Sequence, residues 1–138
     1  AAEEGLVDTD VSIHVGMRGT FYNPGIFEKA RDLGYGLMTY EEIRTRGVDE
    51  ITSDLKQRLA GRPVYLCWDM DFFDPSCAPG VCAPIPGGPS AEEGLRLLRG
   101  LSGLNFVAFD VNTVSPPHDV QGITAQLAAQ VMLMQVVY

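Results

Sequence analysis

The chain has 138 residues, of which 46% are apolar and 20% are charged, a composition typical of globular proteins. Ten basic and eighteen acidic residues give a formal net charge of −8, which argues against nucleic acid or an anionic membrane as the main partner. The length suits one modest domain, and no apolar run is long enough to cross a membrane.

Short strands and helices alternate in the first part of the chain. The predicted segments are, in chain order, a buried strand over 11–15, a turn or loop over 17–19 after Gly16, a helix over 25–33, a strand over 35–39, and helices over 40–46 and 48–59. Gly34 and Gly47 are expected to end two of these helices, because glycine readily takes the left-handed conformation found there. In 48–59 the apolar residues recur at helical spacing, which favours an amphipathic helix.

The alternation continues in the second part. The predicted segments are a buried strand over 64–68, a loop over 75–89, a helix from Ser90 to about Gly103, a strand over 105–109, and a last helix that starts near 121–123. The loop over 75–89 is rich in proline and glycine, and a loop of this length usually carries a function or is disordered. The last helix is apolar nearly all round, so we expect this chain or a neighbour to bury it.

The order of strands and helices predicts an α/β fold with a parallel sheet flanked by helices, in one structural unit without a domain boundary. Ligands of such sheets bind outside the carboxyl ends of the strands. Three segments follow strands in this way: residues 16–19, the acidic run that begins at Asp69, and residues 110–117. A binding site is therefore expected where these segments meet.

Three carboxylates, those of Asp69, Asp71 and Asp74, bunch at the end of the third predicted strand. Asp69 and Asp71 are two residues apart, so in extended chain their side chains would point the same way. Carboxylates beside an apolar core are costly unless a positive charge meets them, and a divalent metal ion is the simplest candidate. The alternative is a solvated loop start in which Asp74 and Pro75 open a turn. An EF-hand is excluded because its spacing and its closing glutamate are missing.

The three cysteines, Cys67, Cys77 and Cys82, lack the spacing of a zinc site, and their odd number indicates free thiols in a reducing compartment. Residues 1–5 have neither the basic end nor the apolar middle of a signal peptide, and no initiator methionine is present. We therefore expect a cytoplasmic protein, and a chain that begins inside a longer polypeptide or has been processed.

The acidic run also carries a specific resemblance. The chain closely resembles the ureohydrolase family of agmatinases, guanidinobutyrases and arginases in the motif Asp69-x-Asp71-x-x-Asp74-Pro75 and in the segments 78–80 and 84–88. Segments 13–19 and 114–119 look like the agmatinase branch. The resemblance spans essentially the whole chain. It implies a three-layer α/β/α sandwich with a mainly parallel sheet, of which residues 1–138 would be the C-terminal portion of a single domain.

Members of that family hydrolyse a guanidino group to urea and an amine at a two-metal site, usually with Mn²⁺; Ni²⁺ also suits a mixed imidazole and carboxylate site. The resemblance implies that Asp69 and Asp71 are metal ligands, that Asp71 is catalytic, and that Asp74 supports the ligands without binding metal. In the family, two histidines and two further aspartates complete the metal site. They lie in the part of the family protein that comes before the first strand of this chain. The chain alone is therefore not expected to assemble the site.

Thr113, Cys82 and His118 are the candidate residues of the substrate pocket, and several positions of the chain depart from the family. Thr113 stands where relatives have a glutamate that pairs with the guanidinium, and Cys82 with Ala83 replaces a segment that carries hydroxyl groups. His118 replaces a tyrosine at the pocket mouth and is interpreted as an exposed loop residue rather than a substrate contact. His14 is interpreted as a core or interface residue. These changes favour an altered substrate: free guanidine, a substituted guanidine or biguanide, or another amidine.

Three functions remain open on these grounds. The first is a metal-dependent amidinohydrolase that acts on a small guanidino compound. The second is a non-catalytic subunit that partners an active paralogue, which Thr113 and the missing ligands favour. The third is a plain α/β binding module. Because relatives form trimers or hexamers, we expect a homo-oligomer, with a paralogous subunit as the other arrangement.

Overall fold

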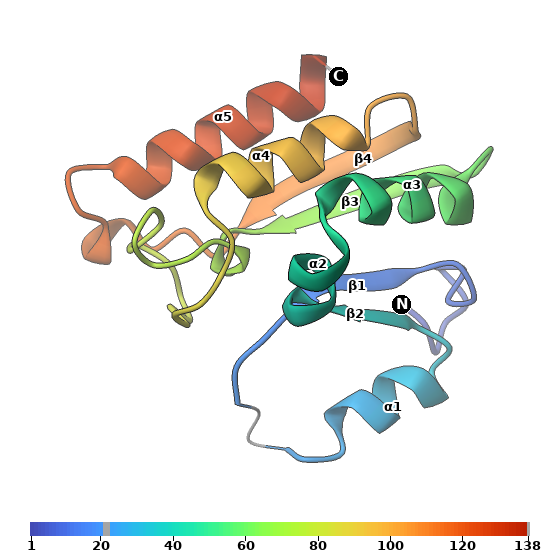
Figure 1. Ribbon diagram of the computed structural model, residues 1–138. Helices are drawn as coiled ribbons and strands as arrows, with labels where there is room; N and C mark the ends of the chain where they lie inside the picture. The colour runs from blue at the N-terminus through green and yellow to red at the C-terminus, as the bar shows by residue number, and fades with distance from the viewer. Residues whose placement is uncertain (21–22, 138) are drawn as a thin grey trace. The chain divides into compact units, whose positions relative to one another are not determined.

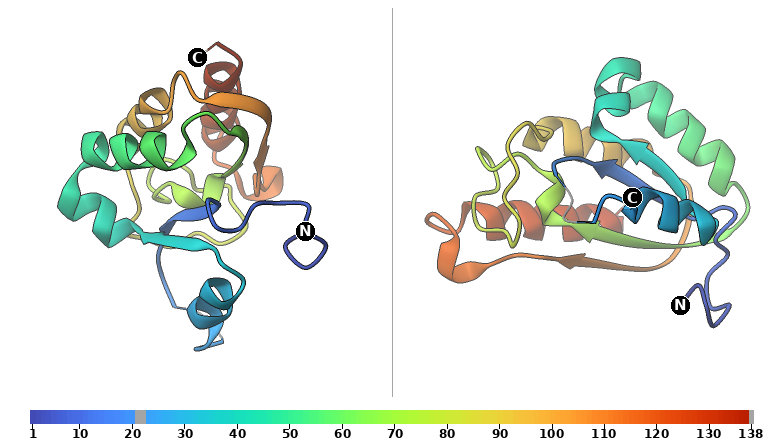
Figure 2. Two further views of the ribbon diagram at one scale, coloured as in Figure 1. Left: turned by 90° about the vertical axis from the view of Figure 1, so that its right-hand side faces the viewer. Right: turned by 90° about the horizontal axis from the view of Figure 1, so that it is seen from below.

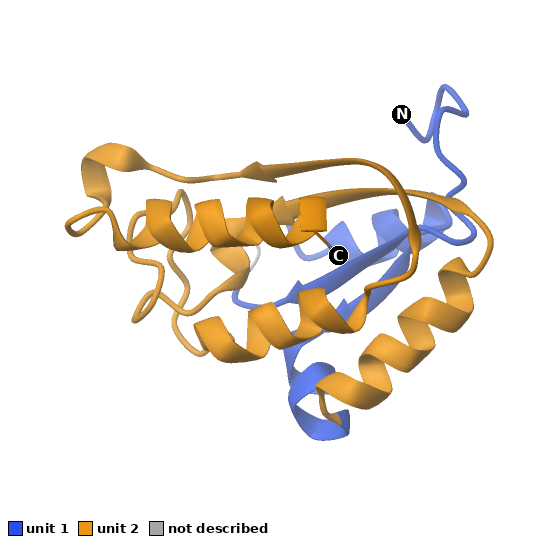
Figure 3. Ribbon diagram, turned by 90° about the horizontal axis from the view of Figure 1, so that it is seen from above, with its two compact units in different colours: residues 1–46 blue, residues 47–138 orange. Residues whose placement is uncertain are grey.

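Strands and helices alternate along the chain in the computed structural model, which describes residues 1–20 and 23–137 (Figure 1). The chain divides into two compact units, residues 1–46 and residues 47–138 (Figure 3). Each unit contains one pair of parallel strands together with helices, as the alternation predicted. The single domain over residues 1–138 stays a prediction.

Unit 1 contains β1 (Ile13–Met17), α1 (Ile26–Asp32), β2 (Gly36–Thr39) and α2 (Tyr40–Arg46). β1 begins two residues later than predicted, because Ser12 turns back through its backbone N–H and its hydroxyl to the carbonyl oxygen of Asp8. β1 also continues through Gly16 to Met17, although Met17 was predicted to begin a turn or loop. The register of β1 on β2 shifts between Val15 and Met17, and this bulge accommodates Gly16 at a φ of 86°.

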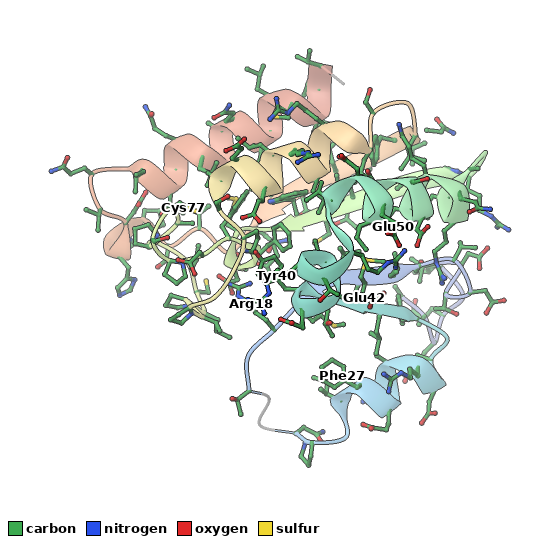
Figure 4. The ribbon with its side chains drawn as sticks, in the orientation of Figure 1. Arg18, Phe27, Tyr40, Glu42, Glu50 and Cys77 are labelled. Atoms are coloured by element: carbon green, nitrogen blue, oxygen red, sulfur yellow. The ribbon has the colours of Figure 1, made fainter. Side chains whose placement is uncertain are left out.

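In unit 1 the prediction for His14 is partly wrong, and the prediction for α2 is confirmed. His14 is exposed and its ring lies 5.0 Å from that of Tyr35, so the interpretation as a core residue is wrong. An interface role for His14 stays a prediction. α2 has the predicted bounds, and Glu42, labelled in Figure 4, accepts from Arg46 one turn later at 3.1 Å.

Unit 2 contains the larger set of elements. In chain order they are α3 (Val48–Leu59), β3 (Pro63–Asp69), a 3₁₀ turn (Met70–Phe72), α4 (Ala91–Gly100), β4 (Asn105–Asn112), a second 3₁₀ turn (Pro116–His118) and α5 (Ile123–Val137). β3 and β4 pair in parallel, and the three helices lie over one face of this pair (Figures 1 and 2). No helix in the described part of unit 2 lies over the other face of the pair (Figures 1 and 2).

The core of unit 2 lies between the strand pair and the helices. Along β3 the burial alternates, so that Val64 and Trp68 are buried while Tyr65 and Cys67 are exposed. The helices contribute the buried apolar side chains of Ile51, Leu55, Leu97, Leu98, Leu127 and Val131. Their packing against one strand face is what holds β3 in place, with Asp69 at its end.

β4 differs in length from the prediction, and α5 is only partly buried by this chain. β4 is three residues longer than expected, because the ladder with β3 continues to the pair Asp69 and Asn112. α5 is buried along one face only: Val131 is fully buried, whereas Leu133 is 62% and Val136 is 71% exposed. Burial of that second face by a neighbour stays a prediction. No helix in the described part of the chain has the length and apolarity needed to cross a lipid bilayer.

Candidate metal centre

Asp69 is the last residue of β3, and Asp71 lies in the 3₁₀ turn that follows. The expectation that both side chains point the same way in extended chain is wrong, because the chain turns at Met70. The two residues are joined instead by a cap: the Asp69 Oδ1 atom accepts the backbone N–H of Asp71 at 2.8 Å. The cap brings the two acidic residues together at the carboxyl end of the strand.

Thr113 follows β4 and links both acidic residues. Its hydroxyl oxygen lies 2.5 Å from Asp69 Oδ1, and the N–H of Asp71 donates to that hydroxyl oxygen at 3.2 Å. The parallel register places Asp69 opposite Asn112, so the ends of the two strands deliver these groups to one point. Thr113 itself has a φ of 64°, which is uncommon for a β-branched residue.

The loop over 75–89 contains no helix or strand, as predicted, and it returns to the same point. The N–H of Ala83 donates to Asp71 Oδ2 at 3.1 Å. The N–H of Cys82 donates to the carbonyl oxygen of Thr113 at 3.1 Å, and the thiol of Cys82 is exposed. Two of the three predicted pocket residues, Cys82 and Thr113, are therefore adjacent to the acidic pair.

Asp74 organises this loop. Its Oδ2 atom accepts the N–H groups of Gly87 at 2.7 Å and Gly88 at 3.0 Å, and its Oδ1 atom accepts the N–H of Ser76 at 2.9 Å. Hydrogen bonds from the side chain and backbone of Ser76, and then from the two glycines, lower the pKa of Asp74 to about 2. Cys77, labelled in Figure 4, lies in the same loop, and its N–H donates to the carbonyl oxygen of Asp74 at 3.0 Å.

His118 lies in the second 3₁₀ turn and is exposed. Its ring Nδ1 atom and the hydroxyl of Ser115 are 2.8 Å apart, and the N–H of Ser115 donates to the carbonyl oxygen of Gly80 at 2.7 Å. The segment that carries His118 is thus tied to the loop over 75–89.

A row of polar side chains on the open face of β3 and β4 was not foreseen. The Tyr65 hydroxyl donates to Asp110 Oδ2, and the Asn112 amide donates to Asp110 Oδ1 at 2.9 Å and to Cys67 Sγ at 3.0 Å. The bond from Tyr65 lowers the pKa of Asp110 and raises that of Tyr65 to about 12. Burial, followed by the Asp110 charge, raises the pKa of the Cys67 thiol. The sequence signal that could have revealed this row is the alternation of Asp110 and Asn112 with apolar neighbours.

The chemistry of Asp69 and Asp71 fits two ligands of a divalent ion that prefers oxygen. Among the described residues, Asp69 Oδ2 has no hydrogen bond, so this oxygen is available to a cation while Oδ1 is held in place. The described part of the chain contains no group of three acidic, histidine or cysteine side chains able to hold a metal. The residues present therefore fit part of a ligand set, and the need for further ligands stays a prediction.

Residues 16–19 were also expected at the site. These residues lie in unit 1. The acidic run and residues 110–117 both lie in unit 2, where Asp69 pairs with Asn112. The meeting of all three segments stays a prediction, as do the roles assigned to the site residues.

Comparison with known proteins identifies relatives over the whole chain. A sequence model described as the Arginase family matches residues 1–137. An agmatinase of Enterobacter sp. (strain 638) is 37% identical over 138 residues, which are 100% of this chain and 42% of that protein. The chain therefore spans less than half the length of this curated relative.

Solved structures of two other proteins superimpose closely on this chain. Proclavaminate amidino hydrolase from Streptomyces clavuligerus superimposes with a TM-score of 0.87 at 36% identity, over 96% of this chain and 43% of that one. A hypothetical agmatinase from Burkholderia thailandensis gives a TM-score of 0.85 at 32% identity, over 98% of this chain and 40% of that one.

Proposed function

The chain belongs to the arginase family, and we propose that it acts, as part of a longer polypeptide, in the metal-dependent hydrolysis of a guanidino or amidino C–N bond. Its α/β fold is arginase-like, as the resemblance implied. The observation that carries the proposal is the paired arrangement of Asp69 and Asp71. The Asp69 carboxylate is held next to the hydroxyl of Thr113, and the Asp71 carboxylate is held by the N–H of Ala83.

The proposed cofactor is a pair of divalent metal ions, Mn²⁺ in the first place and Ni²⁺ as the alternative. Asp69 and Asp71 would supply oxygen ligands to this pair, and the remaining ligands would come from chain that precedes residue 1. When bound, such a pair provides an activated water molecule near neutral pH. Asp74 would contribute indirectly, because it fixes the loop whose residue Ala83 holds Asp71.

The reaction forms a bond between the oxygen of water and the guanidino carbon, and breaks one C–N bond to release an amine. In this proposal a carboxylate oxygen of Asp71 accepts a proton from the attacking water and passes it to the departing nitrogen. The N–H of Ala83 fixes the orientation of that carboxylate. A carboxylate held in this way costs little reorganisation during the reaction.

The proposed substrate is a small guanidino compound other than agmatine. Thr113 is neutral and so offers no charge to a guanidinium group at the position where relatives have a glutamate. The exposed thiol of Cys82 lies on the loop next to Thr113. Free guanidine, a substituted guanidine or biguanide, or another amidine are the candidates.

Urea release by the full-length protein tests the proposal. The protein would be loaded with Mn²⁺ or Ni²⁺ and assayed with agmatine, guanidine, and substituted guanidines and biguanides. We expect urea from one of the latter compounds, and none from the Asp71→Asn variant. A metal-loaded protein that releases neither urea nor an amine or ammonia from any guanidino or amidino compound would overturn the proposal.

A non-catalytic subunit that partners an active paralogue is the second candidate function. The neutral Thr113 and the lack of a complete ligand group among the described residues favour it. Purification of the full-length protein with and without its paralogue distinguishes the two, because a subunit of this kind would bind the paralogue and hold no metal of its own.

The proposal includes a cellular setting and an assembly. The free state of Cys67, Cys77 and Cys82 supports a reducing compartment, and we propose the cytoplasm. We also propose a homo-oligomer, a trimer or hexamer, or an assembly with a paralogous subunit. The exposed apolar side chains of Leu133 and Val136 on α5 support a subunit contact. Nucleic acid and membranes are not among the proposed partners, given the net charge of −8.

A further inference from the structure

Thr113 holds a conformation that its own side chain disfavours. A φ of 64° is rare for a β-branched residue, and such a conformation persists only where the surrounding structure fixes it. Three contacts do so. The carbonyl oxygen of Thr113 accepts the N–H of Cys82 at 3.1 Å, its hydroxyl oxygen accepts the N–H of Asp71 at 3.2 Å, and the hydroxyl lies 2.5 Å from Asp69 Oδ1.

The single hydroxyl hydrogen of Thr113 has two acceptors within reach. Asp69 Oδ1 lies at 2.5 Å and the carbonyl oxygen of Asn112 at 2.7 Å. A carboxylate is the stronger acceptor, and bonds from a hydroxyl to a carboxylate are the shorter kind. The hydrogen therefore belongs to the bond with Asp69, and the hydroxyl oxygen remains an acceptor for the N–H of Asp71. One side chain thus fixes both acidic residues.

We infer that Thr113 is a positioning residue, whose hydroxyl holds Asp69 Oδ1 and thereby presents Oδ2 to a metal ion. This role rests on the proposed function, since it presumes that Asp69 binds metal. It differs from the substrate contact predicted from the sequence, because the hydroxyl is directed at Asp69. Groups that hold a metal ligand from behind fix its orientation and raise the affinity for the metal.

The affinity of the full-length protein for Mn²⁺, measured by isothermal titration calorimetry after removal of bound metal, tests this role. Thr113→Val keeps the shape of the side chain and removes the hydroxyl, whereas Thr113→Ser keeps the hydroxyl. Thr52→Val is the matched control, because the Thr52 hydroxyl donates only to the carbonyl oxygens of Val48 and Asp49 inside α3. Thr113→Ala repeats the test with a smaller side chain if the valine variant does not fold.

We expect Thr113→Val and Thr113→Ala to weaken Mn²⁺ binding by about 10-fold to 100-fold, with Thr113→Ser and Thr52→Val close to the unsubstituted protein. Equal affinity in the valine variant and the unsubstituted protein would overturn the positioning role and leave the proposed function standing. Equal weakening by serine and valine would also overturn it, because the hydroxyl would then not be the cause. An unsubstituted protein that binds neither Mn²⁺ nor Ni²⁺, titrated in the same way, would overturn the proposed function and this role together.

Discussion

The carboxylate of Asp74 accepts a hydrogen bond from the backbone N–H of Gly87, thirteen residues further along the chain, at 2.7 Å. The same oxygen atom also accepts the N–H of Gly88 at 3.0 Å. These bonds close the loop over 75–89, which in turn brings the N–H of Ala83 to the site. Asp74 therefore shapes the candidate metal centre through the backbone of the loop.

Asp74→Asn should destabilise unit 2 at neutral pH. An amide has one acceptor oxygen in place of the two that receive N–H groups here, so at least one backbone donor loses its partner. We expect the free energy of unfolding to fall on the order of 1 kcal/mol, discounted for the partial exposure of the carboxylate. Urea unfolding followed by circular dichroism measures this, with Glu3→Gln as the control at an exposed carboxylate.

The effect of Asp74→Asn should depend on pH. The folded-state pKa of Asp74 lies at about 2, below that of an unfolded aspartate, so the stability it contributes is present above the unfolded value. That contribution is lost as the pH falls through the folded value. The unfolding curves of the variant and the unsubstituted protein should therefore converge as the pH approaches about 2. A difference that persisted unchanged in acid would contradict this account of Asp74.

Gly94→Ala should destabilise the packing of α4. A Cβ atom at this position would lie 2.2 Å from the ring of Phe73, which is fully buried. We expect a loss of about 1–3 kcal/mol in the free energy of unfolding. Phe73→Leu leaves room for the methyl group, so the cost of Gly94→Ala should shrink in that background. Additive losses in the double variant would contradict the proposed clash.

Asp110→Asn should lower the pKa of Tyr65. The Asp110 carboxylate accepts the Tyr65 hydroxyl and is the main cause that raises this pKa to about 12. Without the charge, the phenol should titrate closer to its ordinary value of about 10. The difference between the ultraviolet absorbance titrations of the two proteins isolates this one tyrosine from the other four. Identical titration curves would show that the contact does not form in solution.

Alkylation of Cys82 should inhibit urea release. The thiol is exposed, and the N–H of the same residue donates to Thr113. A bulky group placed there would obstruct the proposed pocket, whereas Cys82→Ser should make the enzyme resistant. Cys67→Ser serves as the control, because it removes the other exposed thiol. If the Cys82→Ser enzyme were inactivated as fast as the unsubstituted one, Cys82 would not line the pocket.

The sequence predicted those elements whose signals are local. α3 has the predicted bounds because its apolar residues recur at helical spacing. The start of α4 was found because Ser90 and Glu93 form a capping box. The proline and glycine content of 75–89 likewise marked a loop. In each case the deciding interactions lie within a few residues of one another, so a single sequence contains them.

The features that were missed depend on partners far along the chain. β4 extends to Asn112 because β3 pairs with it, and the alternation of polar and apolar residues near its end was a weaker sign of a strand than the apolar run before it. The turn at Met70, which places Asp71, was likewise mistaken for extended chain. The left-handed conformation of Thr113 could not be predicted from the sequence, because glycine or asparagine is the residue expected in that conformation. Three long-range hydrogen bonds decide that conformation.

The metal content of the full-length protein tests the central claim most directly. Mass spectrometry of the purified, dialysed protein should find about two divalent ions per chain, mainly Mn²⁺ or Ni²⁺, and clearly less metal in the Asp69→Ala and Asp71→Ala variants. Glu3→Gln, at an exposed carboxylate, should leave the content unchanged. A protein without bound metal, or alanine variants that retain the full content, would contradict the assignment of Asp69 and Asp71 as metal ligands.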